Sequence, residues 1–296
     1  MTTTSAQIAT DIIQHSCECQ VGRGVQKDLI DIVIDTVTEA PRIAYFEAYF
    51  KKLDEYEKPF TKLVRSVWAY EEKIILANLK KLKKAFRQKD NEDDLADSVM
   101  YPKKQMEKRL SDGAKAGIST ILEKEGQAAL DKLGVDIAFD ISDPEITAWL
   151  KEYTPKFSES LEDVNTKVLR RELIAGMEKG ETIPELMVRV EKTFENWDKY
   201  RAEVIARTES NRAASRASLE AWKQSGVVKK KAWFANPGAC PWCVDMDGTT
   251  VSLERTFFDK GDVFTNAAGN EMVLDYIATS SPPLHPNCRC SILPIT

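Results

Sequence analysis

Five cysteine and histidine residues near the C-terminal end of the chain have the types and spacing of a metal site. Cys240-Pro-Trp-Cys243 is a C-x2-C pair, and His285-Pro-Asn-Cys288-Arg-Cys290 supplies three further candidates. Structural zinc sites use four such ligands in a tetrahedron. We expect Cys240, Cys243, Cys288 and Cys290 to bind zinc, with His285 as the alternative for one member of the second pair. Four thiolates leave no position open to water, so the site would be structural; two disulfides or free thiols are the alternatives.

The remaining histidine and cysteine residues offer little further chemistry. The six cysteines form three close pairs, which favours metal binding and a reducing compartment. His15, Cys17 and Cys19 could contribute to a metal site, but we interpret their proximity as incidental. A zinc hydrolase or deaminase would need an H-x-E or H-E-x-x-H motif, and the chain has neither. A redox dithiol works at the start of a helix, whereas the residues from Val244 to Gly248 predict a turn. We therefore expect a protein without enzymatic activity.

Three charged residues accompany these ligands. Arg207 and Glu209 occur in a predicted helix at i, i+2 spacing, so their side chains must meet different partners. Arg289 lies within the second cysteine pair and is the expected partner of Glu209. We interpret Arg207, Glu209 and Arg289 as a structural polar network that fastens the tail to the last helix. The alternative is a catalytic cluster, for which His285 is the only nearby histidine.

Two groups of cations could contact nucleic acid or an acidic partner protein. One lies at the end of a predicted long helix, and the other lies beside Trp233 and Phe234, whose rings could stack on bases. Alternatively, the first group is solvated and complements the helix C-terminus. The formal net charge of -5 argues against tight association with DNA. The first group is Lys80, Lys81, Lys83, Lys84 and Arg87, and the second is Lys229, Lys230 and Lys231.

The spacing of apolar residues predicts long amphipathic helices in the body of the chain. We expect one from Pro59 to about Lys89, and another from Gln105 to Leu133 that Gly113 or Gly117 could interrupt. Residues 1–58 are expected to form short helices.

Capping signals mark the helices that follow. Asp143-Pro144 is a typical N-cap and first-turn pair, and Thr182 and Glu185 have capping-box spacing. The expected helices extend from Asp143 to just before Pro155, from Ser158 to Gly180, from Thr182 to about Trp197, and from Tyr200 to Ser225, where Gly226 ends the last.

The pattern changes after Gly226 to short strand-like runs separated by turn residues. The expected strands are Lys231 to Ala235, Thr249 to Leu253, Met272 to Leu274 and Ser291 to Ile295. Few large aliphatic residues lie here, so burial alone would stabilise this part weakly, whereas a structural zinc site can contribute about 10 kcal/mol. The expected fold class is α+β and mainly α-helical, with long helices followed by a small β-rich, zinc-stabilised C-terminal unit. We divide the chain into residues 1–140, 141–226 and 227–296.

Length and composition are those of a globular protein. The 296 residues are 43% hydrophobic, which is enough for a sizeable core. The start of the chain lacks the pattern of a secretion signal, and no apolar run approaches the roughly 18 residues that span a membrane. We expect no membrane contact.

Several motifs occur together in an informative order. They are Ala206-Arg-Thr-Glu209, Asn211, Gly226, Lys231, Trp233, Asp247-Gly248 and Pro282-Pro-Leu-His-Pro-Asn-Cys-Arg-Cys290. In this order they resemble the Mu F-like head morphogenesis proteins, which are minor capsid proteins of phages. The resemblance covers about Ile146 to Pro294.

The resemblance implies a minor component of the virion head that is assembled in the host cytoplasm. It further implies a protein made beside the portal protein, acting in head assembly, and in some members packaged with the genome. The expected partners are the portal protein, the major capsid protein or scaffold proteins, with packaged DNA as a further candidate. A nucleic-acid-binding virion or prophage protein is the alternative function, and a zinc-dependent hydrolase is the second alternative.

Overall fold

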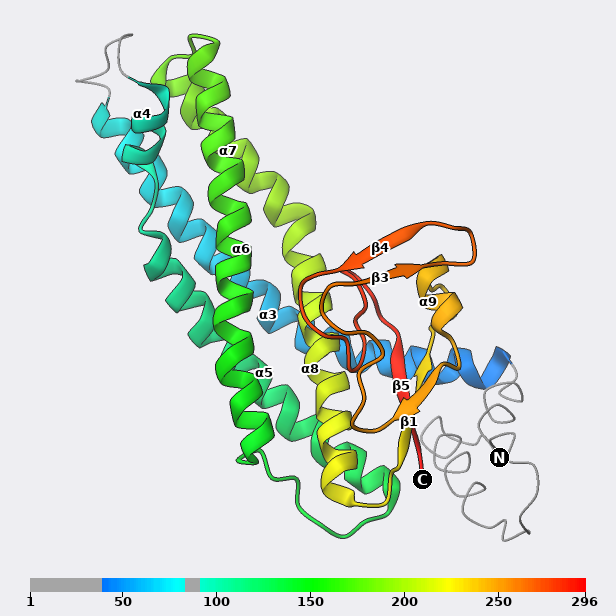
Figure 1. Ribbon diagram of the computed structural model, residues 1–296. Coiled ribbons are helices and arrows are strands. Elements are labelled where there is room, and N and C mark those ends of the chain that lie inside the picture. Colours follow the sequence, from blue (N-terminus) through cyan, green and yellow to red (C-terminus); the bar gives the residue numbers. More distant parts are fainter. Residues whose placement is uncertain (1–38, 83–90) are drawn as a thin grey trace, which may run out of the picture. The chain divides into compact units, whose positions relative to one another are not determined.

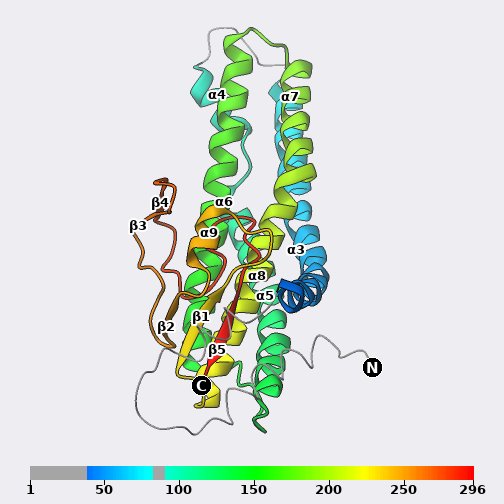
Figure 2. The same ribbon diagram turned by 90° about the vertical axis from the view of Figure 1, so that its right-hand side faces the viewer.

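The computed structural model describes residues 39–82 and 91–296 (Figures 1 and 2). Helices predominate, and small antiparallel sheets lie near the C-terminus, which confirms the expected mainly helical fold with a small β-rich C-terminal part. Its stabilisation by zinc stays a prediction. The described residues form two compact units. Unit 1 contains residues 39–57, 118–141 and 207–296, and unit 2 contains residues 58–82, 91–117 and 142–206. Across both described stretches, no helix has the length and apolar character needed to cross a membrane. The division of the sequence at residues 140 and 226 stays a prediction.

Unit 2 is helical. It contains α4 (Glu92–Val99), α6 (Pro144–Glu178), α7 (Ile183–Asn196), the π-helix η1 (Trp197–Arg201), and parts of α3 (Glu39–Leu82), α5 (Lys103–Leu133) and α8 (Ala202–Ser225). After a short turn, α7 runs back alongside α6 (Figure 1). Apolar residues at helical spacing face inward, and Val67, Ile75, Leu169, Leu173 and Val190 are buried.

The first long helix begins earlier than we expected. α3 starts at Glu39, so Pro59 lies inside the helix and not at its start. An internal proline removes one helical hydrogen bond and commonly kinks or ends a helix. Here Leu53 and Phe60, on either side of Pro59, are both buried, and this packing keeps the chain helical. The expected continuation beyond Leu82 falls on residues 83–89, outside the described residues.

The glycines of α5 do not interrupt it. The helix runs through Gly113 and Gly117 from Lys103 to Leu133. A Cβ atom at Gly113 would lie 2.4 Å from Leu63 Cδ1 of α3. The glycine therefore lets two helices of unit 2 approach closely, and the interruption that we considered possible does not occur.

α6 begins as expected and ends later. The Asp143 side chain caps it by accepting a hydrogen bond from Glu145 N at 2.7 Å. The helix then continues through Pro155 to Glu178, so the predicted end before Pro155 was wrong. Ser158 does not start a new helix, because its Oγ donates to Pro155 O at 2.8 Å within the same one.

The predicted turn between α6 and α7 is confirmed. Gly180 has a φ of 71°, a conformation that glycine adopts readily at a helix end. Glu185 Oε2 accepts hydrogen bonds from Thr182 N at 2.6 Å and from Thr182 Oγ1 at 2.7 Å, which forms the expected capping box. α8 ends at Ser225 before Gly226, also as expected.

Unit 1 packs a small sheet against α8. β1 (Lys230–Phe234) is the middle strand, paired antiparallel with β2 (Thr250–Ser252) and β5 (Ser291–Ile295). β3 (Asp262–Thr265) and β4 (Glu271–Leu274) form a separate hairpin. In chain order, α9 (Pro241–Met246) follows β1 and precedes β2. Leu130 of α5, Trp222 of α8, Leu253 and Ile292 share one buried cluster. The sheet and two helices therefore share one of the buried clusters of this unit.

The predicted strands are present, with boundaries that differ by at most one residue, but two elements were not foreseen. β3 was missed, because Asp262 and Gly261 make its start resemble a turn. α9 begins directly after Cys240, where we expected a turn. We had argued against a redox dithiol because no helix was expected after Cys240. Since α9 begins there, that argument no longer holds.

A cluster of polar side chains lies buried in the helical core of unit 2. Glu71 of α3 and Glu162 of α6 are both fully buried. Tyr101 Oη donates to Glu162 at 2.8 Å, and Arg201 donates to Asn165 Oδ1 at 2.6 Å. Burial, with the nearby Glu162 carboxylate, raises the pKa of Glu71 to about 10. Glu71 therefore carries a proton at neutral pH, because two adjacent buried carboxyls resist joint ionisation.

Replacing Glu71 by glutamine should stabilise the protein above about pH 5. The folded pKa of about 10 exceeds the ordinary value of 4.5, so the unfolded chain releases this proton first. In the parent chain, the contribution of protonated Glu71 to the free energy of unfolding is thus fully present below the unfolded pKa. It is lost as pH rises towards the folded pKa, by at most about 1.4 kcal/mol per pH unit. Glutamine does not titrate and avoids this loss. Urea unfolding between pH 5 and pH 8 should show a flatter decline for Glu71→Gln than for the parent chain.

The control for this measurement is Glu159→Gln, at an exposed position of α6. It should retain the pH dependence of the parent chain. Equal slopes for Glu71→Gln and the parent would contradict a protonated Glu71.

Candidate metal centre

Five cysteine and histidine side chains converge in unit 1, where the sequence predicted a metal site. The ligand atoms of Cys240, Cys243 and His285 lie within 4.8 Å of one another, and so do those of Cys243, Cys288 and Cys290. Cys243 belongs to both groups and links them. The four cysteines are free thiols and form no disulfide. Together these groups could hold a metal ion.

The distances in this cluster suit tetrahedral coordination. Cys243 Sγ lies 3.7 Å from Cys288 Sγ, and zinc–sulfur bonds of about 2.3 Å give a tetrahedral edge of about 3.8 Å. His285 Nε2 lies 3.4 Å from Cys243 Sγ and 2.9 Å from Cys240 Sγ. The histidine thus joins the Cys240–Cys243 pair directly. The geometry supports two ligand groups that share Cys243. One group also contains Cys240 and His285, and the other contains Cys288 and Cys290.

Two short segments position the ligands. Cys240 is the N-cap residue of α9, and Cys243 lies in its first turn. In the second segment, which we call the ligand loop (residues 285–290), Asn287 has a φ of 65°. This left-handed conformation, which asparagine tolerates better than most residues, reverses the chain so that Cys288 N donates to His285 O at 3.2 Å. The reversal brings the side chains of His285 and Cys288 close to Cys243.

Hydrogen bonding among the thiols shifts their pKa values in opposite directions, and the hydrogen bond with Cys288 raises the pKa of the Cys243 thiol. Hydrogen bonds from Cys243 and Cys290 hold the pKa of the Cys288 thiol well below its usual range. His285 Nδ1 lies 2.8 Å from Pro286 O, and donation to this carbonyl leaves Nε2 as the free ligand atom. Thiolate and neutral imidazole are the forms that bind metals, so an ion would replace the protons that the thiols share.

α8 holds the ligand loop through buried polar side chains. Asn211 is fully buried, and its Nδ2 donates to both main-chain oxygens of the Cys288 and Cys290 pair, at 2.9 and 3.2 Å. Its Oδ1 accepts from Tyr49 Oη of α3 at 2.7 Å. Thr208 Oγ1 accepts from the main-chain nitrogen of Asn287 at 2.9 Å. The loop is therefore fixed to α8 by hydrogen bonds at three of its residues.

Two arginines extend this attachment to the first helix. Arg289 forms ion pairs with Glu57 and with Asp54 Oδ1, the latter at 2.7 Å. Arg207 donates to Asn287 Oδ1 at 2.7 Å, and its Nε lies 3.6 Å from Glu57 Oε2. Glu57 thus receives both arginines, one from α8 and one from the ligand loop.

The pairing of Glu209 differs from our expectation. As predicted, Arg207 and Glu209 meet different partners. However, Glu209 Oε2 lies 3.5 Å from Arg212 Nε, one turn further along α8. The carboxylate partners of Arg289 among the described residues are Asp54 and Glu57 of α3, and not Glu209. The network therefore fastens the tail to two helices, whereas we expected one.

The cations beside β1 do not form the surface that we expected. Lys231 is fully buried, and its Nζ donates to a main-chain oxygen after β2 at 2.8 Å. Burial lowers its pKa to about 8. Trp233 and Phe234 are also buried, so their rings cannot stack on bases. Lys229 is exposed and Lys230 is half-buried, which leaves a single fully exposed cation in this group.

The other predicted contacts are partly described. Lys80 and Lys81 are exposed in the last turn of α3. The predicted residues outside the described part of the chain are Lys83, Lys84, Arg87, His15, Cys17 and Cys19.

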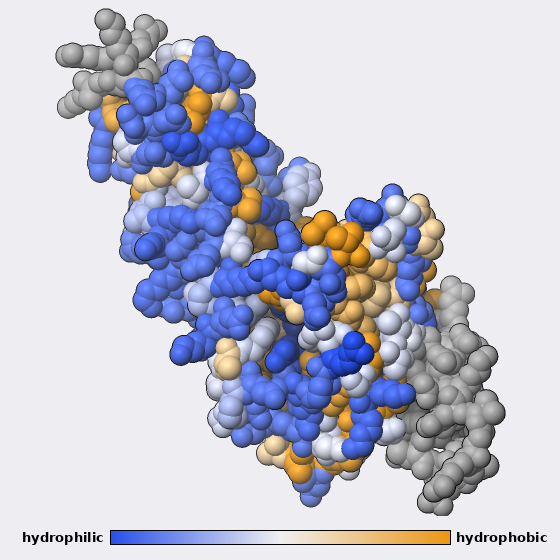
Figure 3. All heavy atoms as spheres, viewed as in Figure 1, coloured by the Kyte–Doolittle hydropathy of each residue, from blue (hydrophilic) through white to orange (hydrophobic). Residues whose placement is uncertain are grey.

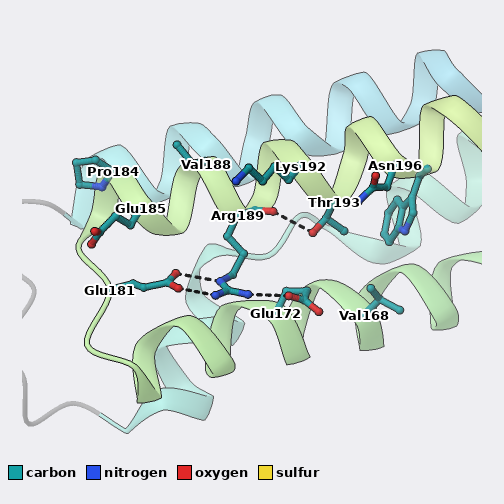
Figure 4. Close-up of a pocket in the computed structure, with 11 residues that line it drawn as sticks. Val168, Glu172, Glu181, Pro184, Glu185, Val188, Arg189, Lys192, Thr193 and Asn196 are labelled. Carbon is teal, nitrogen blue, oxygen red and sulfur yellow. Dashed lines mark hydrogen bonds and ion pairs between the residues drawn. The ribbon is translucent and has the colours of Figure 1, made fainter.

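A groove of about 700 Å³ lies between α6 and α7 in unit 2 (Figure 4). Arg189 lies at its centre, with Nε 2.9 Å from Glu181 Oε2 and NH1 2.9 Å from Glu172 Oε2. These ion pairs satisfy the arginine and link the two helices. We therefore interpret the groove as a structural feature.

Sequence reasoning missed the α3 residues that serve this site. Tyr49, Asp54 and Glu57 lie on the part of α3 that precedes Pro59, where we expected short helices. An uninterrupted helix through Pro59 would have placed Asp54 and Glu57 one turn apart on one face. Asn211 was noted as a motif residue, but its buried amide bonds to the ligand loop were not foreseen.

Replacing Asn211 by alanine should destabilise unit 1 by about 2–4 kcal/mol, because it removes the amide hydrogen bonds of two buried carbonyls and of the Tyr49 hydroxyl. Asn211→Asp should be equally severe, since a carboxylate cannot donate to the carbonyls. Tyr49→Phe removes only one of the three hydrogen bonds and should cost about 1 kcal/mol.

Urea unfolding of the three variants, read from tryptophan fluorescence, checks this order. Trp233 lies in the core beside the thiols and should report on unit 1. If Asn211→Ala unfolded within about 0.5 kcal/mol of the parent, the amide would not hold the loop.

Comparison with known proteins bears on this region. Residues 167–293 match the family model described as "Phage Mu protein F like protein". The chain is similar to "Uncharacterized protein YqbB" of Bacillus subtilis (strain 168), with 24% identity over 255 residues that cover 83% of this chain and 79% of that protein. No solved structure matches the chain. The matched span includes α8, the Cys240–Cys243 pair and the ligand loop, and it confirms the resemblance that the motifs indicated. Residues 167–293 are therefore similar to the phage Mu F-like family.

Proposed function

We propose that the chain is a non-enzymatic minor head protein of a phage that acts in head assembly at the portal. Its C-terminal region would be held together by one structural zinc ion. The observation that carries the proposal is the direct bonding among the family motifs. Asn211, Thr208 and Arg207 of α8 all contact the ligand loop, and the loop carries three of the five candidate ligands.

The burial of the thiols supports a structural ion. Cys243, Cys288 and Cys290 are at most 3% exposed. Four cysteine and histidine ligands complete a tetrahedron and leave no position for a water molecule or a substrate. Such an ion would link α9, the ligand loop and, through Asn211, α8. This role agrees with the small size of the sheet, whose strands have three to five residues.

The proposed partners follow from the family. They are the portal protein and, in addition, the major capsid protein or scaffold proteins, with packaged DNA as a further candidate. The protein would be assembled in the host cytoplasm and reside in the virion head. The long helices and the hairpin of unit 1 would supply the contact surfaces.

Nucleic-acid binding is the alternative function. The exposed Lys80 and Lys81 at the end of α3 favour it. The net charge of -5 and the burial of Lys231 and Trp233 weigh against it. A zinc-dependent hydrolase, the second alternative, would need a ligand position open to water.

Metal analysis should find about one zinc per chain, as a single tetrahedral site requires. Cys243→Ser should abolish binding, because Cys243 belongs to both ligand groups, and Cys288→Ser should do the same. Elemental analysis of the purified protein and thermal unfolding with and without a chelator provide the measurements. Cys19→Ser, which removes a thiol that we do not expect to bind the metal, should retain it.

Two further variants identify the fourth ligand. His285→Asn should release zinc if the histidine completes the site, whereas Cys290→Ser should release it if the cysteine does. Full zinc occupancy in both Cys243→Ser and Cys288→Ser would exclude the proposed site.

The portal contact can be tested with purified proteins. The chain should bind an assembled portal of the same phage in the absence of DNA, as measured by sedimentation. Titration with double-stranded DNA should show weak affinity at physiological salt. Tight DNA binding with a steep salt dependence, together with no portal binding, would instead favour the nucleic-acid alternative.

A further inference from the structure

The β3–β4 hairpin of unit 1 presents an apolar pair on its outer face. Val263 and Val273 lie directly opposite each other in the strand register. They are 53% and 60% exposed, which places them among the most exposed large aliphatic residues of the described chain. The space-filling view shows hydrophobic surface over this hairpin, next to hydrophilic side chains (Figure 3). Directly opposed side chains on one face of a hairpin form a continuous contact surface.

The inner face explains why the valines point outward. Phe264 and Met272, the next pair in the register, pack against the buried cluster that contains Trp233 and the thiols. Leu274 is itself part of that cluster. Because side chains alternate between the two faces of a strand, this anchoring fixes Val263 and Val273 on the opposite face.

The hairpin is also fixed at its turn. Asn266 Oδ1 accepts hydrogen bonds from Ala268 N at 3.1 Å and from Asn270 N at 2.9 Å. Asp245 of α9 accepts a hydrogen bond from Ala267 N at 2.5 Å. An isolated two-stranded hairpin is at best marginally stable. Here the anchored inner face and the tethered turn hold the outer face in a defined geometry.

The segment that carries the valine pair is acidic. Residues 259–275 contain four carboxylates and one lysine, a net charge of -3, and all five side chains are exposed. Glu271 pairs with Thr265 on the same face as the valines, one pair further towards the turn. The surface therefore combines an aliphatic centre with a negative rim. The carboxylates are Asp259, Asp262, Glu271 and Asp275.

Both edges of the hairpin are open to another strand. Within residues 39–82 and 91–296, β3 and β4 form a sheet of two strands that is separate from the sheet of β1, β2 and β5. Unpaired strand edges accept extended segments of other chains by main-chain hydrogen bonding.

We propose that the outer face of the β3–β4 hairpin is the docking surface for an extended segment of a partner head protein, in which aliphatic residues alternate with lysine or arginine. The aliphatic residues would cover Val263 and Val273, and the cations would meet the carboxylate rim. The proposal rests on the proposed function and assigns its protein contact to one surface.

The charge of the hairpin selects this occupant over others. The phosphates of DNA and the headgroups of anionic lipids would face like charges. A second copy of this chain would bring the same net charge of -3 against the first, and facing charges of the same sign disfavour association. A basic protein segment is attracted instead, and its aliphatic residues gain contact area from the valines.

The test compares variants for binding to the purified portal assembly and for copies incorporated per head in a complementation assay. Val263→Asp with Val273→Asp should weaken binding about tenfold or more and reduce incorporation in proportion. Val263→Thr with Val273→Thr retains the shape and strand preference of the valines, and it should cause a smaller loss of about threefold. Glu271→Gln, which neutralises a carboxylate on the same face as the valines, should reduce both the affinity and its dependence on salt.

The matched control replaces an exposed valine of unit 1 outside the hairpin, Val227, by aspartate. This control should bind and incorporate like the parent chain. Zinc content and thermal unfolding, measured for every variant, show whether the hairpin variants retain a folded unit 1. The threonine pair remains informative if the aspartate pair fails to fold.

The outcomes separate the two proposals. If the parent chain binds the portal or enters heads and the hairpin variants do so equally well, the docking surface is wrong and the proposed function stands. If the parent chain does neither, the proposed function fails and the docking surface fails with it. A parent chain that dimerises through Val263 and Val273 would also overturn the inference.

Discussion

The buried amide of Asn211 is the interaction on which the C-terminal region depends. It bonds to two main-chain oxygens of the ligand loop and to Tyr49, so one side chain joins α3, α8 and the loop. A buried amide must satisfy its donors and acceptors or incur a large desolvation cost. The loop therefore has one low-energy position on α8, and in this position Cys288 and Cys290 meet Cys243 of α9.

Charged side chains have different roles in the two units. In unit 1, Glu57 receives Arg207 and Arg289, and these partly exposed groups fasten the tail to the helices. In unit 2, Glu71 and Glu162 are buried together, and the protonation of Glu71 avoids placing two negative charges in an apolar core. The first arrangement relies on attraction between opposite charges, and the second relies on neutralisation.

The same thiol cluster supports the interior and the surface of unit 1. Trp233, Leu274 and the cysteines pack together, with Phe264 and Met272 of the hairpin against them. A metal ion at this cluster would thereby hold both the attachment to α8 and the outward orientation of Val263 and Val273. In a head protein, such a link would provide a rigid contact surface from a segment with few large aliphatic residues.

The sequence by itself determined the fold class, the capping box at Thr182, the end of α8 and the candidate ligands, because these depend on local propensities and short spacings. Tertiary structure decided what lies far apart in the chain. Packing on both sides of Pro59 kept α3 helical, which local preference opposes. The fold also brought Asp54 and Glu57 of this helix beside Arg289 of the ligand loop. Packing also buried Lys231 and Trp233, which sequence pattern alone had suggested as surface residues. Burial and long-range pairing depend on which surfaces meet in the folded chain, and residue spacing along the sequence does not specify this.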